Sequence, residues 1–333
     1  MIALVTGASG FIGSHIADRC LKDGYQVRVL VRKGNGAIPD LANRDVTVIE
    51  GDIRDASAVS RAVEGCDIVF HAAAVTSDWG ELQDFIDINV GGTRNVAEAA
   101  LRTRVGRLVY ISTIELFDHM KSERIDEGMP CHIRNQPYPD TKIAATRLIW
   151  EYAARGLEVS VVYPAMVYGP GDRTVFPLIA DGLSKGMLFY WAWHARMNLV
   201  YIDNLVDLVM LAATHPEAAG EGFLACDSTV PTFEAFCDRL ASGIDVRSPF
   251  IYLPFSLAYL LASIMEMVYR FTGSDTRPML TRQAVTLLAS RAMFDTSKAR
   301  NKLGWNPKVT YDEGFRITLD WLRGIDPSQW KRK

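Results

Sequence analysis

The chain has 333 residues, of which 49% are hydrophobic and 23% are charged, and its formal net charge is -3. These values are ordinary for a globular protein with a large core, and they give no reason to expect nucleic acid or acidic lipid as the main partner. The five cysteines are scattered and form no C-x-x-C pair, so we expect neither a disulfide framework nor a bound metal. We expect a cytoplasmic protein without a signal peptide, since a strand pattern starts directly after Met1.

The chain begins with an apolar run, a glycine turn and an amphipathic stretch. Residues 2–5 predict a buried strand, and the next eight residues read Thr-Gly-Ala-Ser-Gly-Phe-Ile-Gly. Gly7, Gly10 and Gly13 allow a sharp turn, the approach of a pyrophosphate and close packing of helix on strand. The helix N-terminus offers free N–H groups and a positive dipole to such an anion. In this context the motif predicts a dinucleotide site rather than a plain glycine-rich turn.

Strand and helix patterns alternate through the first half. Strands are predicted at residues 2–5, 26–31, 46–50, 68–71, 107–112 and 158–163, and helices at 56–63, 88–101 and 142–155. This order predicts an α/β fold, a Rossmann-type doubly wound parallel sheet with helices on both faces. Ligands of such sheets bind beyond the carboxyl ends of the strands.

The alternation stops after Pro164, where turn formers and irregular connections begin. We therefore predict an NAD(P)-binding domain over residues 1–165 and a smaller C-terminal substrate-binding lobe over residues 166–333. This lobe is expected to return to the sheet with a strand at 223–226. Its helices are predicted at 232–240, 255–271 and 311–323.

An uncharged stretch runs from Ser248 to Met265. It is close to the minimum length of a membrane span, but Pro249 and Pro254 interrupt it. Packing on the rest of the lobe is the favoured interpretation, and a lid over an apolar substrate or a peripheral membrane contact through residues 250–271 are the alternatives. The expected apolar face of its helix carries Leu257, Leu260, Leu261, Ile264, Val268 and Phe271.

Tyr138 and Lys142 are four residues apart, so both side chains share one face of a helix. A lysine ammonium beside a tyrosine hydroxyl lowers the pKa of the tyrosine, which can then exchange a proton with an alcohol or ketone near neutral pH. Thr113 ends the strand expected at 107–112 and is predicted to hold the substrate oxygen. The neighbouring Ser112 is interpreted as a strand-end hydroxyl that satisfies local backbone. A surface pair is the plain alternative for Tyr138 and Lys142, but the dinucleotide turn ahead of them favours catalysis.

These segments together resemble the extended short-chain dehydrogenase/reductase family over nearly the whole chain. The resemblance implies a Rossmann domain with a nicotinamide cofactor, proton transfer by Tyr138 and a homodimer that packs through two helices. Two positions depart from the family pattern, since Tyr163 replaces a common arginine and Thr146 a common acidic residue. The matching segments are residues 6–13, 51–55, 71–74, 89–93, 163–164, 167–172 and 295–307, together with Tyr138 and Lys142.

The resemblance also implies roles for individual residues around the catalytic Thr113, Tyr138 and Lys142. Asp52 and Ile53 would flank the adenine, Ala72, Ala73 and Ala74 would line the ribose and nicotinamide, and Asn89 would support the water and lysine network. Pro164 and Val167 would border the nicotinamide, and His71 is interpreted as a structural residue. The full expected cofactor-binding set is Gly7, Ser9, Gly10, Phe11, Ile12, Gly13, Arg32, Lys33, Asp52, Ile53, Ala72, Ala73, Ala74, Asn89, Tyr138, Lys142, Pro164 and Val167.

The substrate class is argued from two further segments. Residues 126–131 and 201–206 resemble those of 3β-hydroxysteroid and sterol dehydrogenases, and the second-strand region resembles dihydroflavonol-reductase-like enzymes. We therefore expect an oxidoreductase that interconverts a secondary alcohol and a ketone on a fairly apolar, steroid-, sterol- or flavonoid-like substrate. A nucleotide-sugar epimerase or dehydratase is the alternative. A non-catalytic cofactor-sensing regulator is a second alternative, against which the intact Thr113, Tyr138 and Lys142 argue.

The choice of cofactor is read from Arg32 and Lys33, which follow the strand expected at 26–31. NAD-preferring folds carry an acidic residue near this position that binds the ribose hydroxyls, and no Asp or Glu occurs between Gly24 and Pro39. A guanidinium can hold a phosphate through two parallel charge-assisted bonds. We therefore expect NADP(H) to be favoured over NAD(H), unless both cations merely face solvent.

Overall fold

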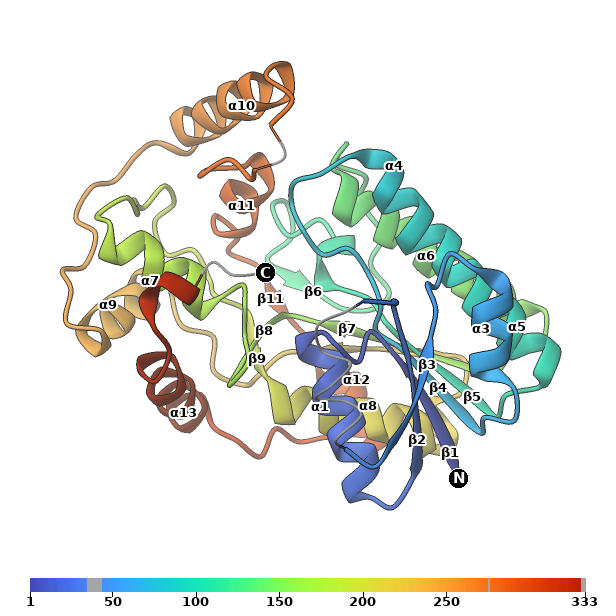
Figure 1. Cartoon of the computed structure of the whole chain (residues 1–333). Coiled ribbons are helices and arrows are strands. Elements are labelled where there is room, and N and C mark those ends of the chain that lie inside the picture. Colours follow the sequence, from blue (N-terminus) through green and yellow to red (C-terminus); the bar gives the residue numbers. More distant parts are fainter. Residues whose placement is uncertain (35–43, 275, 331–333) are drawn as a thin grey trace.

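A computed structural model describes residues 1–34, 44–274 and 276–330 of the chain. Within these residues, seven parallel strands form a central sheet in the order β10-β7-β5-β4-β1-β2-β3 (Figure 1). The chain builds outward from β1 to β3 and then returns to add β4 on the other side of β1, so the topological switch point lies between β1 and β4. The strands are β1 (Ile2–Thr6), β2 (Gln26–Val31), β3 (Val46–Glu50), β4 (Ile68–His71), β5 (Arg107–Ile111), β7 (Val159–Pro164) and β10 (Glu221–Ala225).

Helices cover both faces of the sheet, which confirms the predicted Rossmann-type architecture (Figure 1). Part of the helix expected at 88–101 is a π-helix, η1 (Ile86–Gly92). The helix that carries Tyr138 begins at Pro137, five residues earlier than expected, because a helix tolerates proline in its first turn. One face carries α3 (Ala56–Val63), α4 (Leu82–Phe85), η1, α5 (Thr93–Thr103) and α6 (Pro137–Ala154), and the other carries α1 (Phe11–Lys22), α8 (Ile202–Thr214) and α12 (Ser297–Leu303).

Apart from the short turn η3 (Pro216–Ala218), which directly precedes the amino end of β10, the remaining elements lie beyond the carboxyl ends of the strands. Two small parallel pairs form there, β8 (Met166–Tyr168) with β9 (Leu199–Tyr201) and β6 (Arg124–Ile125) with β11 (Met293–Phe294). The other short turns are η2 (Ile114–Leu116) and η4 (Pro327–Gln329). The helices are α7 (Phe176–Ser184), α9 (Phe233–Gly243), α10 (Phe255–Phe271), α11 (Arg282–Leu287) and α13 (Tyr311–Arg323).

The turn between β1 and α1 requires glycine at two positions. Gly7 has a φ of +77°, and a Cβ atom there would lie 2.8 Å from the backbone nitrogen of Ala73, which follows β4. A Cβ atom at Gly13 would lie 2.2 Å from the carbonyl oxygen of Gly7. These glycines therefore let α1 and the end of β4 approach the same turn.

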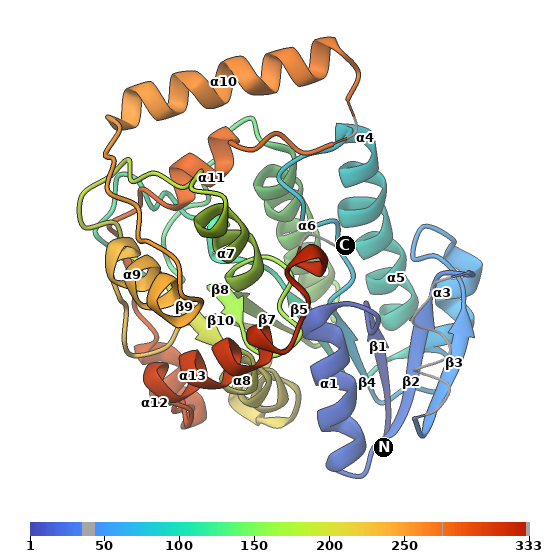
Figure 2. The same cartoon turned by 60° about the vertical axis from the view of Figure 1, so that its left-hand side comes forward.

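Helix α10 lies across the molecule above α11 (Figure 2). Its buried residues are Ala258, Ala262 and Glu266, and the carboxylate of Glu266 accepts bonds of 2.7 Å from the backbone and the Nε of Arg282. The expected packing of the apolar face is therefore wrong, because the helix packs through two small residues and an ion pair instead. No helix in the described part of the chain is both long and apolar enough to span a bilayer. The six residues of the apolar face are 41% to 92% exposed: Leu257, Leu260, Leu261, Ile264, Val268 and Phe271.

We expect Gly13→Ala to destabilise the protein by about 1–3 kcal/mol, because the new methyl group meets backbone atoms that cannot move aside. Gly182→Ala in α7 is the matched control, since its nearest neighbour would be 3.6 Å away in the side chain of Leu188. Removal of this helical glycine should leave stability unchanged or raise it by up to about 1 kcal/mol. Urea unfolding of both variants measures the difference, and equal stabilities would contradict the close approach at Gly13.

Candidate active site

The first part of the site is the N-terminus of α1, which faces the carboxyl ends of the strands. Gly10 precedes the helix, its backbone N–H donates to the oxygen of Gly7 at 2.9 Å, and no side chain caps the helix. Ser9 lies just before Gly10, and the first turn of the helix, which starts with Phe11 and Ile12, carries no acidic residue. Backbone N–H groups and the helix dipole are therefore available to an anion, and the turn fits the pyrophosphate of a dinucleotide.

A buried chain of hydrogen bonds closes the switch point beside this turn. His71 ends β4, with its Nδ1 2.7 Å from the hydroxyl of Thr6 and its Nε2 2.9 Å from the hydroxyl of Thr93. Burial lowers the pKa of His71 to about 3, so the ring is neutral. Both ring nitrogens have protein partners, which agrees with the structural interpretation of this residue. Ala72, Ala73 and Ala74 follow directly, next to Gly7.

Asn89 connects the loop after β4 to the helix of the catalytic pair. Its Oδ1 accepts a bond of 2.8 Å from the backbone of Val75, and its Nδ2 donates to the oxygen of Val75 and to the hydroxyl of Thr141, both at 3.1 Å. Thr141 directly precedes Lys142 in α6. The amide therefore orients α6 relative to β4 without bonding to the lysine itself.

Lys142 and Tyr138 both lie buried on α6, but their side chains do not pair in the expected way. The Nζ of Lys142 donates bonds of 2.7 Å to the hydroxyl of Tyr110 and to the carbonyl of Ile111. These acceptors belong to β5, which faces this helix, and burial lowers the pKa of Lys142 to about 7. Burial also raises the pKa of Tyr138 well above its usual value, which the hydroxyl of Thr113 offsets in part. The expected lowering by the lysine is thus absent from this structure.

The strand-end hydroxyls next to the pair differ in their bonding. Ser112 lies 2.8 Å from the hydroxyl of Thr146, which itself donates to the carbonyl of Lys142 at 2.8 Å. The hydroxyl of Ser112 therefore bonds to a side chain of α6 and not to local backbone as predicted. The hydroxyl of Thr113 accepts a bond of 3.2 Å from the backbone N–H of Glu115. Thr113 is the residue of the two that acts on Tyr138.

The residues expected at the adenine end follow β2 and β3, which are neighbours in the sheet. Arg32 and Lys33 are exposed beyond β2. Both carboxylate oxygens of Asp52 accept bonds of 2.9 to 3.0 Å from the guanidinium of Arg54, and this contact, helped by Arg32, lowers the pKa of Asp52. Ile53 is buried against Gly92, where a Cβ atom would lie 2.4 Å from its side chain.

A buried carboxyl group that the sequence analysis missed lies next to Tyr138. Glu115 in η2 accepts bonds of 2.9 and 3.2 Å from the Nε2 of Gln283 in α11. Burial raises the pKa of Glu115 to about 7, and its charge in turn raises the pKa of Tyr138. Nothing in the sequence pairs these two residues, which are 168 positions apart; the one signal was the place of Glu115 just beyond a strand end.

A second missed contact holds the loop after β4 to the lobe. Both carboxylate oxygens of Asp78 accept bonds of 2.5 Å from the guanidinium of Arg277, and one also accepts a bond of 2.5 Å from the hydroxyl of Thr281. The Nε1 of Trp79 donates to the carbonyl of Ser274 at 3.2 Å. The segment between α10 and α11 is therefore fixed to the loop that follows the switch point.

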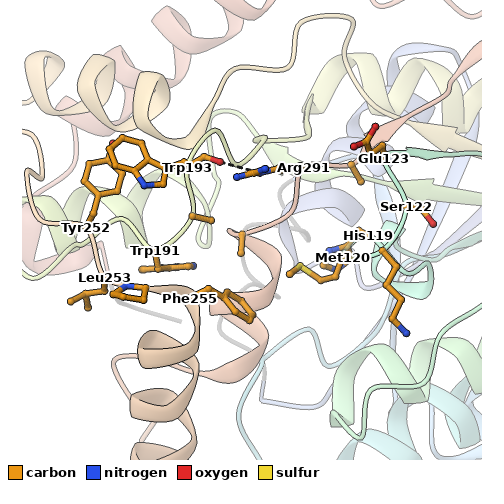
Figure 3. A pocket seen from close by; sticks show the side chains of 15 residues that line it. His119, Met120, Ser122, Glu123, Trp191, Trp193, Tyr252, Leu253, Phe255 and Arg291 are labelled. Carbon is orange, nitrogen blue, oxygen red and sulfur yellow. Dashed lines mark hydrogen bonds between the residues drawn. The ribbon is translucent and has the colours of Figure 1, made fainter.

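A cavity of about 710 Å³, shown in Figure 3, is lined in part by residues that follow the C-terminal end of α11. None of the expected catalytic or cofactor-binding residues lines it, and Pro164 and Val167 lie elsewhere, at the end of β7 and in β8. Within the described ranges, no three His, Cys, Asp or Glu side chains gather as a metal site. The cavity walls include His119, Trp191, Trp193, Tyr252, Phe255 and Arg291.

Known proteins with similar sequences are dehydrogenases and reductases. A "3beta-hydroxysteroid-dehydrogenase/decarboxylase isoform 2" of Arabidopsis thaliana is 29% identical over 99% of this chain, although the chain spans only 64% of that protein. A "2-alkyl-3-oxoalkanoate reductase" of Stenotrophomonas maltophilia is 30% identical, with 95% of this chain and 98% of the relative covered.

The fold matches solved structures over the whole chain. One is a UDP-glucuronic acid 4-epimerase from Bacillus cereus in complex with UDP-glucuronic acid and NAD, with a TM-score of 0.79 and 21% identity. The match covers 98% of this chain and all of that one. The sequence profile of the NAD dependent epimerase/dehydratase family matches residues 3–224, which include most of the sheet, the glycine turn after β1 and the pair of Tyr138 and Lys142. The chain therefore belongs to the NAD dependent epimerase/dehydratase family, within the extended short-chain dehydrogenases/reductases, and is an enzyme that uses a nicotinamide cofactor.

Proposed function

We propose that the protein interconverts a secondary alcohol and a ketone on a fairly apolar substrate, with Tyr138 as the proton-transfer residue. The observation that carries the proposal is the convergence of buried Tyr138, Thr113 and Lys142 at the carboxyl end of β5. Residues 1–165 would bind the cofactor and residues 166–333 the substrate. The relatives named for a 3beta-hydroxysteroid and for a 2-alkyl-3-oxoalkanoate support an apolar substrate, as does the absence of charge from residues 248–265.

The proposed chemistry needs one proton and one hydride. When bound, the nicotinamide ring supplies the hydride that reduces the carbonyl carbon. Thr113 holds the carbonyl oxygen, and the hydroxyl of Tyr138 gives that oxygen its proton, so the ketone becomes an alcohol and the tyrosine a phenolate. Lys142 bonds to Tyr110 in this structure and would hold a ribose hydroxyl of the bound cofactor. Its ammonium would then stabilise the phenolate that burial alone disfavours.

We expect Tyr138→Phe to lower turnover by about two to four decades while the cofactor still binds, because the ring stays and only the proton donor is lost. Ketosteroids, 2-alkyl-3-oxoalkanoates, flavanonols and UDP-sugars are scanned as substrates through the absorbance of the reduced nicotinamide. Tyr152→Phe, on the same helix with its hydroxyl on Glu98, is the matched control and should retain turnover. Full activity of Tyr138→Phe on a demonstrated substrate would refute this assignment.

We also propose that NADP(H) is preferred and that Arg32 reads the 2′-phosphate. Arg32 is exposed and close enough to Asp52 to influence it, so it stands near the end of the sheet where the adenine ribose is expected. The carboxylate of Asp52 is already occupied by Arg54, which leaves the guanidinium of Arg32 for a phosphate. NAD(H) stays the alternative.

Arg32→Ala should weaken NADPH by roughly ten- to a hundredfold and hardly alter NADH, because a charge-assisted bond is worth about 1.5–3 kcal/mol. Tryptophan fluorescence quenching by each cofactor gives the two dissociation constants. Arg61→Ala, which removes an exposed cation from α3, controls for general charge and should leave both constants unchanged. Equal losses for both cofactors, or a wild type that prefers NADH, would contradict the proposal.

We further propose that the exposed apolar face of α10 contacts a membrane surface and that the protein is a cytoplasmic homodimer. The membrane contact is supported by six exposed apolar side chains on one helix face and by exposed Phe250 before it. Arg270 lies in the last turn of this helix, and the one acidic residue of the helix, Glu266, is buried in an ion pair. A neutral or anionic lipid surface would therefore meet no repulsion from the helix. The homodimer, through α5 and α6, rests on the family resemblance.

The membrane contact predicts flotation of the purified protein with phosphatidylcholine vesicles. Leu261→Ser together with Ile264→Ser should weaken this binding about ten- to a hundredfold, because each removes apolar area from the lipid contact. Leu82→Ser removes an even more exposed leucine outside α10 and should leave flotation unchanged. Failure of the wild type to float would overturn the membrane contact and leave the lid interpretation.

A further inference from the structure

Glu115 and Gln283 form a polar pair that is buried at the catalytic end of the sheet. Their side chains come from η2 and α11, and the two residues are 9% and 7% exposed. The Nε2 of Gln283 donates to both carboxylate oxygens of Glu115, at 2.9 and 3.2 Å. Within the described part of the chain, the Oε1 of Gln283 is buried and has no hydrogen-bond partner. An acceptor of this kind is normally paired in a folded protein, so the pair is one donor short.

The surrounding groups do not supply that donor. Arg134 donates to the backbone carbonyl of Glu115 rather than to its carboxylate. Asp78, which also faces the pair, is itself an acceptor whose oxygens are taken by Arg277 and Thr281. Tyr138, whose pKa the charge of Glu115 raises, keeps its hydroxyl for the reaction in the proposed mechanism. A donor from outside the protein is therefore the group that would complete the set.

The pair also lies close to the reacting position. Glu115 is two residues beyond Thr113, and its backbone N–H donates to the hydroxyl of Thr113 at 3.2 Å. The charge of Glu115 acts on Tyr138, so the carboxylate and the tyrosine share one buried region. A substrate whose oxygen is held by Thr113 and Tyr138 would thus place its adjacent carbon atoms near Glu115 and Gln283.

We propose that Glu115 and Gln283 bind a hydroxyl group carried by the substrate next to the carbon that is oxidised or reduced. The carboxylate of Glu115 and the amide oxygen of Gln283 both accept hydrogen bonds, so they select a donor and reject an apolar group at this position. The substrate is then a hydroxy ketone or the corresponding diol on an otherwise apolar skeleton. This inference rests on the proposed function and narrows its substrate class.

The test compares two probes that differ by one hydroxyl group, a 5α-steroid 3-ketone and the same ketone with a hydroxyl on carbon 2 or carbon 4. The wild type with its cofactor should favour the hydroxylated probe by about a hundredfold or more in kcat/KM, because a site built to bond a hydroxyl leaves buried acceptors unpaired with the analogue. Gln283→Leu and Glu115→Gln should each cut this preference at least tenfold. Turnover of the plain ketone by Gln283→Leu should change much less, because this substitution keeps the charge of Glu115 that acts on Tyr138.

Arg282→Lys is the control variant, since it alters the contact of α11 with Glu266 and leaves the pair intact. If Glu115 and Gln283 merely anchor α11, then Gln283→Leu would lose stability and both probes would suffer alike, as with Arg282→Lys. An unchanged preference in folded Gln283→Leu and Glu115→Gln would overturn the inference while Tyr138→Phe still tests the proposed function separately.

A crystal structure of the enzyme with bound cofactor tests the geometry without any turnover. A water molecule or probe hydroxyl bonded to both the Oε1 of Gln283 and the carboxylate of Glu115 would support the inference. A protein donor on that oxygen, or side chains that separate the pair from Tyr138, would overturn it. If side chains separate the pair from Tyr138 and the enzyme converts neither steroid probe, the hydroxyl site is refuted. The role of Tyr138 is then tested with the other ketones that are scanned.

Discussion

The architecture depends on a backbone contact that tolerates no side chain, between the turn after β1 and the chain after β4. Gly7 makes this contact possible, because any Cβ there would overlap the backbone at Ala72 and Ala73. The contact lies at the switch point, where β1 and β4 pair in parallel. His71, at the end of β4, strengthens it through its hydrogen bonds to Thr6 and Thr93. The N-terminus of α1 and the chain after β4 thus lie side by side at the switch point, where the cofactor is proposed to bind.

A second set of buried polar groups positions α6, the helix that carries Tyr138, relative to β4 and β5. Asn89 ties the loop after β4 to Thr141, and Lys142 ties the next residue of α6 to Tyr110 and Ile111 on β5. Burial lowers the pKa of Lys142 to about 7, and an anionic cofactor beside it would raise this pKa and favour the ammonium form. Binding of the cofactor and activation of Tyr138 are therefore expected to be coupled.

Local pattern was enough to predict most of the sheet and the glycine turn. The strands at 26–31, 46–50 and 68–71 and the helices at 56–63 and 311–323 have the predicted bounds, since each is set by its own apolar period and flanking turn residues. The partner of Lys142 could not be predicted this way, because Tyr110 contacts it only through the packing of α6 against β5. The predicted packing of the apolar face of α10 was wrong for a related reason. Periodicity identifies an apolar face, but it does not say whether the rest of the protein covers that face.

Helix α11, which carries Gln283, contacts both α10 and the region of Tyr138, and neither contact is visible in the sequence pattern. Gln283 follows Arg282, whose backbone and guanidinium bond to Glu266 of α10, while Gln283 itself bonds to Glu115 beside Tyr138. Two consecutive residues of a six-residue helix therefore join the exposed helix to the proposed catalytic centre. If α10 rests on a lipid surface, its orientation fixes α11 and with it the polar wall of the proposed substrate site. An apolar skeleton could then enter from the lipid side, while its hydroxyl is selected by Glu115 and Gln283 within the protein.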